Sequence, residues 1–150
     1  MMMVSLIVCA SAVLTAATVL FVIGKFNQLV SLRRKIATEM LQMDFALRLQ
    51  CEELRRTSQS DPEILLGAEM LSHQAVSEPL SSESLKKLDE AAELILPLCA
   101  AADVRGGPIR EASQKIRSLT LDDNENLRTS PVCRLIARVL RYEDPGAAKS

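Results

Sequence analysis

The sequence predicts an all-α membrane protein, in which an N-terminal transmembrane helix continues into a long helix of an antiparallel helical bundle. Residues 1–24 contain no charged side chain, so all 18 Lys and Arg and all 19 Asp and Glu lie beyond them. Aromatic residues are only 3% of the chain and Trp is absent, while Leu, Ala, Glu and Arg dominate, a composition that favours helices over sheets. Beyond residue 24, apolar residues recur every three or four positions, the spacing of one helical face.

The chain therefore divides into an anchor over residues 1–24, a helical bundle over 25–142 and a disordered tail over 143–150. Met3 to Ile23 forms an uncharged run of 21 residues, which as a helix is about 30 Å long and matches the hydrocarbon core of a bilayer. Lys25 and the basic group Arg33-Arg34-Lys35 follow this run. The positive-inside rule then predicts a short N-terminus outside and a cytoplasmic C-terminal domain.

Three other interpretations of the anchor stay open from the sequence. A buried core helix has similar composition. A cleaved signal peptide would have a basic segment before a shorter apolar run, and nothing basic precedes this one. A lipidated Cys9 is a third alternative, although Val8 is bulky for the residue before such a cysteine.

We expect one long helix from the anchor to about Thr57, because Gly24 is the only helix-weakening residue in this stretch. Its apolar face is formed by Leu29, Leu32, Ile36, Met40, Met43, Leu47, Cys51 and Leu54. Charged residues, Arg33 and Arg48 among them, are expected to fall away from this face. The face would pack inside a bundle, or alternatively form a coiled-coil seam between chains. Asp44 lies beside the face and needs a partner if buried, for which Arg48 has the i,i+4 spacing.

Capping signals place the other helices. Asp61-Pro62 begins a second helix, which should end before Pro79. A third begins at Ser81-Ser82, and Pro97 should kink it or end it early. After the break at 106–108 a short helix is expected to end near Leu119.

The acidic run 122–126 is then expected to be an exposed loop before a last helix that begins at Ser130-Pro131. The apolar residues of that last helix are Val132, Leu135, Ile136, Val139 and Leu140.

The residues offer little for catalysis. His73 is the only histidine, so a histidine cluster for a metal or a Ser–His pair cannot be built within one chain. The four cysteines form no C-x-x-C pair, and run 122–126 lacks the glycine and closing Glu of a calcium loop. The near-neutral charge of -1 argues against nucleic-acid binding. We therefore expect a non-enzymatic protein without a cofactor or metal.

Two segments resemble the LemA family of anchored bacterial proteins. Phe26-Asn27-Gln28-Leu29-Val30-Ser31-Leu32-Arg33 is similar to the segment that follows the anchor in that family, and Asp44 and Leu47-Arg48 continue the match. Near the C-terminus Arg134, Ile136, Ala137 and Tyr142 resemble its last helix. The chain departs from the family at Met40, where Trp is usual, at 53–56, and by stopping soon after Tyr142. The resemblance implies an antiparallel bundle, a bacterial setting and a cytoplasmic C-terminus, but no defined activity.

These observations favour a membrane-anchored scaffold. It would contact the lipid bilayer through its N-terminal helix and an unidentified protein partner through its bundle, with oligomers possible. The alternative is a small accessory or sensing subunit, whose anchor packs on another membrane protein through the small residues Ala10, Ala12, Ala16 and Ala17.

Overall fold

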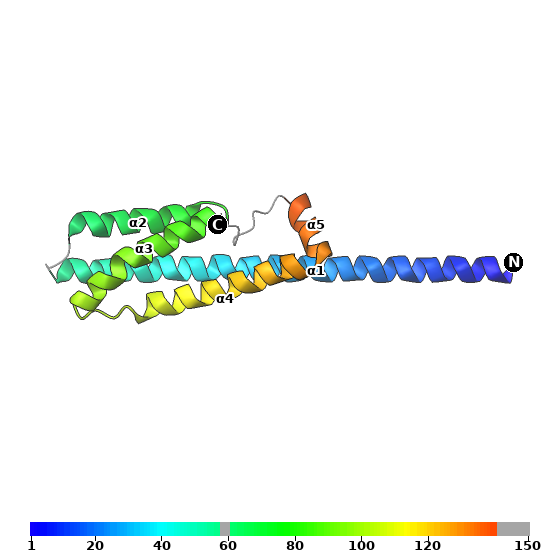
Figure 1. The fold of residues 1–150 in the computed structure, drawn as a ribbon, viewed down its shortest axis with the longest axis horizontal. Helices are drawn as coiled ribbons and strands as arrows, with labels where there is room; N and C mark the ends of the chain where they lie inside the picture. The colour runs from blue at the N-terminus through cyan, green and yellow to red at the C-terminus, as the bar shows by residue number, and fades with distance from the viewer. Residues whose placement is uncertain (58–60, 141–150) are drawn as a thin grey trace.

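All regular secondary structure in the described part of the chain, residues 1–57 and 61–140, is helical in the computed structural model (Figure 1). The helices are α1 (Met2–Arg56), α2 (Pro62–Ser77), α3 (Ser82–Ala101), α4 (Gly107–Thr129) and α5 (Pro131–Val139). The second half of α1 packs with α2, α3 and α4, whose directions alternate, whereas its first half projects from this bundle (Figure 1). The short α5 runs across α1 near the point where the bundle ends (Figure 1). The all-α prediction is thus confirmed.

The N-terminal half of α1 is an isolated apolar helix. Every residue from 1 to 24 is exposed, and the segment is long and apolar enough to cross a membrane. The hydroxyls of Ser11, Thr15 and Thr18 donate to carbonyls of the preceding turn at 2.8–2.9 Å, so these polar groups are satisfied within the helix. The interpretation of this segment as a core helix is wrong, because none of its most apolar stretch is buried.

The helix continues through Gly24 and ends at Arg56, within one residue of the predicted end. Seven of the eight residues expected on its apolar face are buried, namely Leu29, Ile36, Met40, Met43, Leu47, Cys51 and Leu54. Leu32 is only half-buried, and Arg33 is buried instead. Arg33 lies four residues after Leu29 and three before Ile36, so the buried face passes through it. The prediction that Arg33 falls away from this face is therefore wrong.

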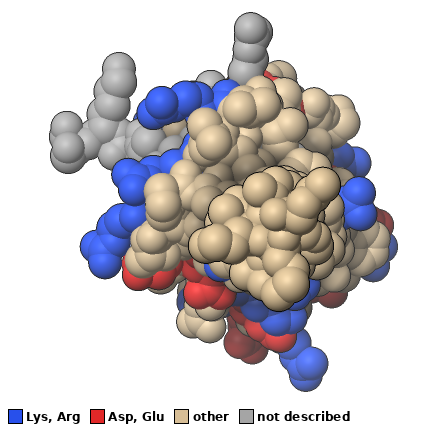
Figure 2. Space-filling model, turned by 90° about the vertical axis from the view of Figure 1, so that its right-hand side faces the viewer, with Lys and Arg blue, Asp and Glu red and all other residues tan. Residues whose placement is uncertain are grey.

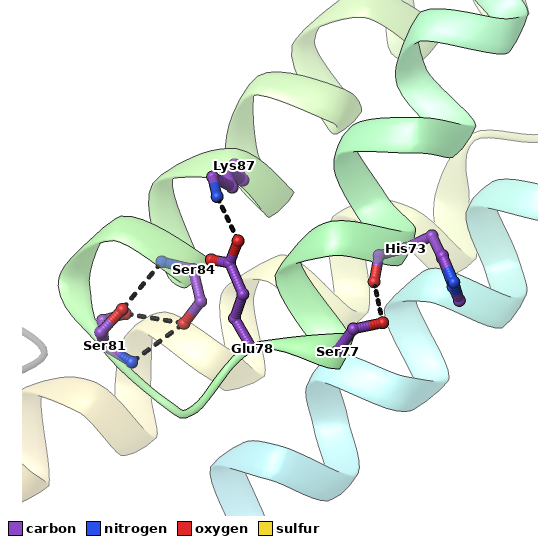
Figure 3. Close-up of polar contacts among 6 residues, drawn as sticks. All are labelled: His73, Ser77, Glu78, Ser81, Ser84 and Lys87. Carbon is purple, nitrogen blue, oxygen red and sulfur yellow. Dashed lines mark hydrogen bonds and ion pairs between the residues drawn. The ribbon is translucent and has the colours of Figure 1, made fainter.

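Side-chain caps start α2, α3 and α5. The Asp61 carboxylate accepts from Glu63 N at 2.9 Å, and the Ser130 hydroxyl accepts from Cys133 N at 3.3 Å, so both Asx/Ser-Pro starts are where the sequence predicts them. At α3, Ser81 and Ser84 cap each other reciprocally (Figure 3). These bonds satisfy backbone N–H groups that the first turn leaves without partners.

The connection between α2 and α3 is short and closed by an ion pair. Lys87 Nζ on α3 donates to Glu78 Oε1 at 2.6 Å, just after α2 ends at Ser77 (Figure 3). The turn reverses the direction of the chain, so α3 runs back against α2 and inclines away from it toward its C-terminal end (Figure 1).

Pro97 lies inside α3, which continues to Ala101, so of the two expected effects an early end of the helix does not occur. One helix boundary differs from the predictions. The acidic run 122–126 is no loop but lies inside α4, which extends to Thr129. The buried face of α4 continues through this run, because Ile116, Asp123 and Leu127 are spaced by seven and four residues and all are buried. Asp123 thus occupies a core position of the helix. The sequence analysis placed it in a loop because the run 122–126 is polar.

Candidate functional site

The two segments that resemble the LemA family meet at Leu29, where the projecting part of α1 joins the bundle. Leu29 of α1 packs in a small apolar cluster with Leu127 of α4 and with Cys133 and Ala137 of α5, and Ile136 covers its side. Leu29 is 1% exposed. Residues about a hundred positions apart in the chain therefore form one contact, which fixes α5 against α1 where the bundle gives way to the projecting helix (Figure 1).

Behind this cluster lies a buried ion pair. Arg33 Nη2 donates to Asp123 Oδ2 at 3.1 Å, and the Asp123 side chain is fully buried while that of Arg33 is 8% exposed. The pair separates the Leu29 cluster from the main core, which begins at Ile36. Within the basic group Arg33-Arg34-Lys35, Arg33 is thus buried, whereas Arg34 and Lys35 stay exposed.

A second polar network joins α1 to α2. Asp44 is buried, as its position suggested, and its predicted partner Arg48 contacts it through Nε at 3.1 Å. Ser72 of α2, which the sequence did not indicate, donates its hydroxyl to Asp44 Oδ1 at 2.6 Å. Arg48 also donates to His73 Nδ1 at 3.0 Å. One carboxylate therefore ties two helices, and its charge is matched by the guanidinium.

The remaining residues of the resemblance scatter between core and surface. Leu47 is fully buried in the main core, Val30 and Leu32 are half-buried, and Phe26, Asn27 and Arg134 are exposed. Tyr142 lies outside the described residues, as does the tail 143–150. Among the described residues, those of the resemblance are thus spread over both core and surface positions of the bundle.

An apolar groove lies between α1 and α4. Leu41, Phe45 and Leu49 lie four residues apart on α1 and are 58%, 69% and 47% exposed. Ala46, Pro108 and Ala112 complete the apolar lining, and Glu39, Gln42, Glu111 and Lys115 supply a polar rim. The sequence analysis missed this groove because it considered only the apolar face of α1 that contains the most residues, from Leu29 to Leu54. The i, i+4, i+8 spacing of the three residues was the available signal.

No group of three or more His, Cys, Asp or Glu in the described ranges is placed to hold a metal ion. His73 is exposed, its ring bonds to Arg48, and its carbonyl accepts from Ser77 Oγ at 2.7 Å (Figure 3). The side chain of His73 thus has a structural partner on α1. Ser72, beside it, is fully buried, which keeps its hydroxyl from a substrate.

The bundle cysteines are buried thiols. Burial first, and the nearby Glu69 carboxylate second, raise the pKa of Cys51 to about 12. Burial and then Glu53 raise the pKa of Cys99 in the same direction. Cys133 is also buried, and all four cysteines are free. A thiol with a raised pKa is a poor nucleophile at neutral pH, so Cys51 and Cys99 act as small apolar groups.

Alkaline pH should therefore destabilise the bundle through Cys51. Its thiol loses its proton near pH 9.0 in the unfolded chain and near 12 in the folded one, so the contribution to stability is full below pH 9.0 and falls as the pH rises toward 12. We expect wild-type unfolding free energy to fall more steeply over this range than that of Cys51→Ala, measured by urea denaturation. Parallel pH profiles for the two proteins would contradict the assignment.

Comparisons of this chain with protein-family models, with curated proteins and with solved structures find no match. The LemA resemblance thus depends on the residues quoted above, two segments of which the structure brings into contact at Leu29.

Proposed function

We propose that this protein is a membrane-anchored helical scaffold whose cytoplasmic bundle binds a helix of another protein in the groove between α1 and α4. The observation that carries the proposal is the construction of α1. One uninterrupted helix of 55 residues is wholly exposed and apolar in its first part and forms the bundle core in its second part. Such a helix links a bilayer directly to a folded domain.

Lipid is the environment that suits the first part of α1. An apolar helix with no packing partner in the described chain would expose a large patch to water. Its helical backbone and the hydroxyls of Ser11, Thr15 and Thr18 form hydrogen bonds within the helix, which suits the hydrocarbon phase. A cleaved signal peptide fits less well, because Phe21, Val22 and Ile23 before Gly24 do not provide the small residues of a cleavage site. Exposed Arg34 and Lys35 favour the cytoplasmic orientation of the bundle.

The groove has the characteristics of a helix-binding surface. Its three exposed apolar residues follow one helical line for two turns, and a polar rim surrounds them. Amphipathic helices bind such grooves through apolar anchors spaced by three, four or seven residues. A coiled-coil seam between chains is less suitable, because the apolar face of α1 that would form it packs against the other helices of the bundle.

The LemA family is the best candidate for kinship. The resemblance supports an anchored bundle with a cytoplasmic C-terminus in a bacterium, and it agrees with a scaffold because it implies no defined reaction. Anchoring would raise the effective concentration of the bundle at the membrane, so that a weak contact in the groove could suffice.

A photo-crosslinking amino acid in place of Phe45 tests the proposal in native membranes. We expect the full-length protein to stay in the membrane fraction after alkaline extraction and to give a discrete adduct with another protein. The adduct should disappear in the double variant Leu41→Ser/Leu49→Ser, because the apolar anchors on either side of position 45 are lost. The melting midpoint of this double variant should stay near that of the wild type, since the side chains of Leu41 and Leu49 are both exposed.

Leu94 of α3 is a matched control position, because it is also apolar and exposed but lies outside the groove. The same adduct from positions 45 and 94, or an adduct insensitive to the serine variants, would refute the groove as the binding surface. An adduct of twice the chain mass would identify a second copy as the occupant. Loss of the adduct on Ala12→Leu/Ala16→Leu would favour the accessory-subunit alternative.

A further inference from the structure

The helix α5 has three distinct faces. Cys133 and Ala137, one turn apart, are buried against α1. Leu135 and Val139, also one turn apart, are 61% and 73% exposed, and Leu140 is 40% exposed. On the third side, Arg134 and Arg138 are exposed. Leu135 and Val139, two of the apolar residues that the sequence places in the last helix, are therefore exposed in the structure.

The position of α5 makes its apolar face unusual. It packs on α1 at Leu29, six residues after the apolar run ends at Ile23, which is about 9 Å along the helix. It runs across α1 and not along it (Figure 1). If α1 crosses a bilayer, α5 thus lies parallel to the membrane surface. A helix radius of about 5 Å brings its near side to within several ångströms of the hydrocarbon boundary, at the level of the headgroups.

The view along α1 from its N-terminal end agrees with this placement. Figure 2 shows uncharged side chains next to and above the projecting helix, on the side where α5 leaves α1, with Lys and Arg mostly at the rim. Phe26 of α1 is exposed at the same level. An uncharged surface therefore continues from the projecting helix sideways onto the bundle (Figure 2).

We infer that α5 is an interfacial helix that inserts Leu135 and Val139 into the cytoplasmic surface of the membrane that α1 crosses, with Arg134 and Arg138 near anionic headgroups. This inference rests on the proposed anchoring. An exposed apolar face flanked by arginines is the pattern of helices that lie in the membrane interface. Long arginine side chains can extend to the headgroups while the helix stays lower. The second contact would fix the bundle upright beside the bilayer and leave the α1–α4 groove open to the cytoplasm.

Fluorescence provides a direct test because the chain has no Trp. Single variants Val139→Trp and Arg138→Trp of the full chain are reconstituted in vesicles of phosphatidylcholine with phosphatidylglycerol, with and without bromine on the acyl chains. We expect Trp emission at 139 to shift to shorter wavelength and to lose intensity in brominated lipid. The neighbouring position 138, on the basic side of the helix, should show a much smaller loss.

Two further positions separate this inference from the anchoring on which it rests. Leu14→Trp reports the anchor, and Leu66→Trp reports an exposed site on α2 in the bundle. Quenching at 14 and 139 but not at 66 supports the interfacial helix. Quenching at 14 without quenching at 139 overturns the interfacial helix and leaves the anchoring intact. A blue shift of the emission at 139 without quenching counts as this outcome, because a contact with protein also shifts Trp emission. No quenching at 14 overturns the anchoring itself.

A charge-reduced variant tests the arginines. Arg134→Gln/Arg138→Gln in the Val139→Trp background should lose part of the quenching in vesicles that contain phosphatidylglycerol, and it should match its parent in phosphatidylcholine alone. Equal quenching in both lipids for parent and variant would show that anionic headgroups contribute nothing.

Discussion

Asp123→Asn is expected to lower the free energy of unfolding by about 3–5 kcal/mol, because it removes the buried carboxylate that accepts from the guanidinium of Arg33. Asp123 is fully buried and Arg33 nearly so, with 3.1 Å between Nη2 and Oδ2. Water therefore cannot restore the lost solvation of the charge. Urea denaturation of the detergent-solubilised full chain, followed by the helical signal in circular dichroism, measures the change.

Two controls make this prediction specific to burial. Glu52→Gln removes the carboxylate of an exposed i,i+4 pair with Arg56 and should cost less than about 1 kcal/mol. The double variant Arg33→Met/Asp123→Leu, which removes both charges, should recover most of the lost stability. An Asp123→Asn variant no less stable than Glu52→Gln would refute the importance of the pair.

The same pair sets the register of α4 on α1. A shift of α4 by one turn would place Leu119 or Leu127 opposite Arg33, so that two charges would be buried apart from each other. The correct register instead puts Asp123 against Arg33 and Leu127 against Leu29. The contact that positions α5 at the foot of the anchor thus depends on an ion pair between segments 90 residues apart.

Local signals in the sequence were enough to predict most of the helices. The charge-free run, the caps at Asp61, Ser81 and Ser130 and the three-four spacing of α1 each depend on nearby residues, and the structure confirms them. Asp44 was also recognised as a buried carboxylate, because an acidic residue beside an apolar face needs a partner.

The errors share one physical origin, which is pairing between residues distant in the sequence. Arg33 and Asp123 each look like surface residues alone, but in the structure their contact favours burial of both. The sequence analysis therefore placed Arg33 on the solvent-facing side of α1 and placed Asp123 in a loop. The groove was missed for a related reason, since an exposed apolar line such as that at Phe45 is recognised only when the neighbouring helix is known not to cover it.

Leu47→Ala should cost about 2–5 kcal/mol of stability, through lost burial and the cavity left behind. Leu47 is fully buried in the main core of the bundle, where α1 contacts the other three helices. The midpoint of thermal or urea unfolding measures this effect. Since the bundle holds the groove and α5 in place, the variant should also weaken cross-linking at position 45 once it is partly unfolded.

Leu49→Ala, two residues further along the same helix, should show the opposite pattern. Its side chain is 47% exposed and lines the groove, so its removal should change stability by less than about 1 kcal/mol. It should nevertheless reduce the adduct at position 45, because a binding anchor is lost while the fold remains. Loss of stability in Leu47→Ala and loss of the adduct without loss of stability in Leu49→Ala would together show that the groove binds a partner and is not part of the core. Equal loss of stability in both variants would instead make the groove part of the folded interior.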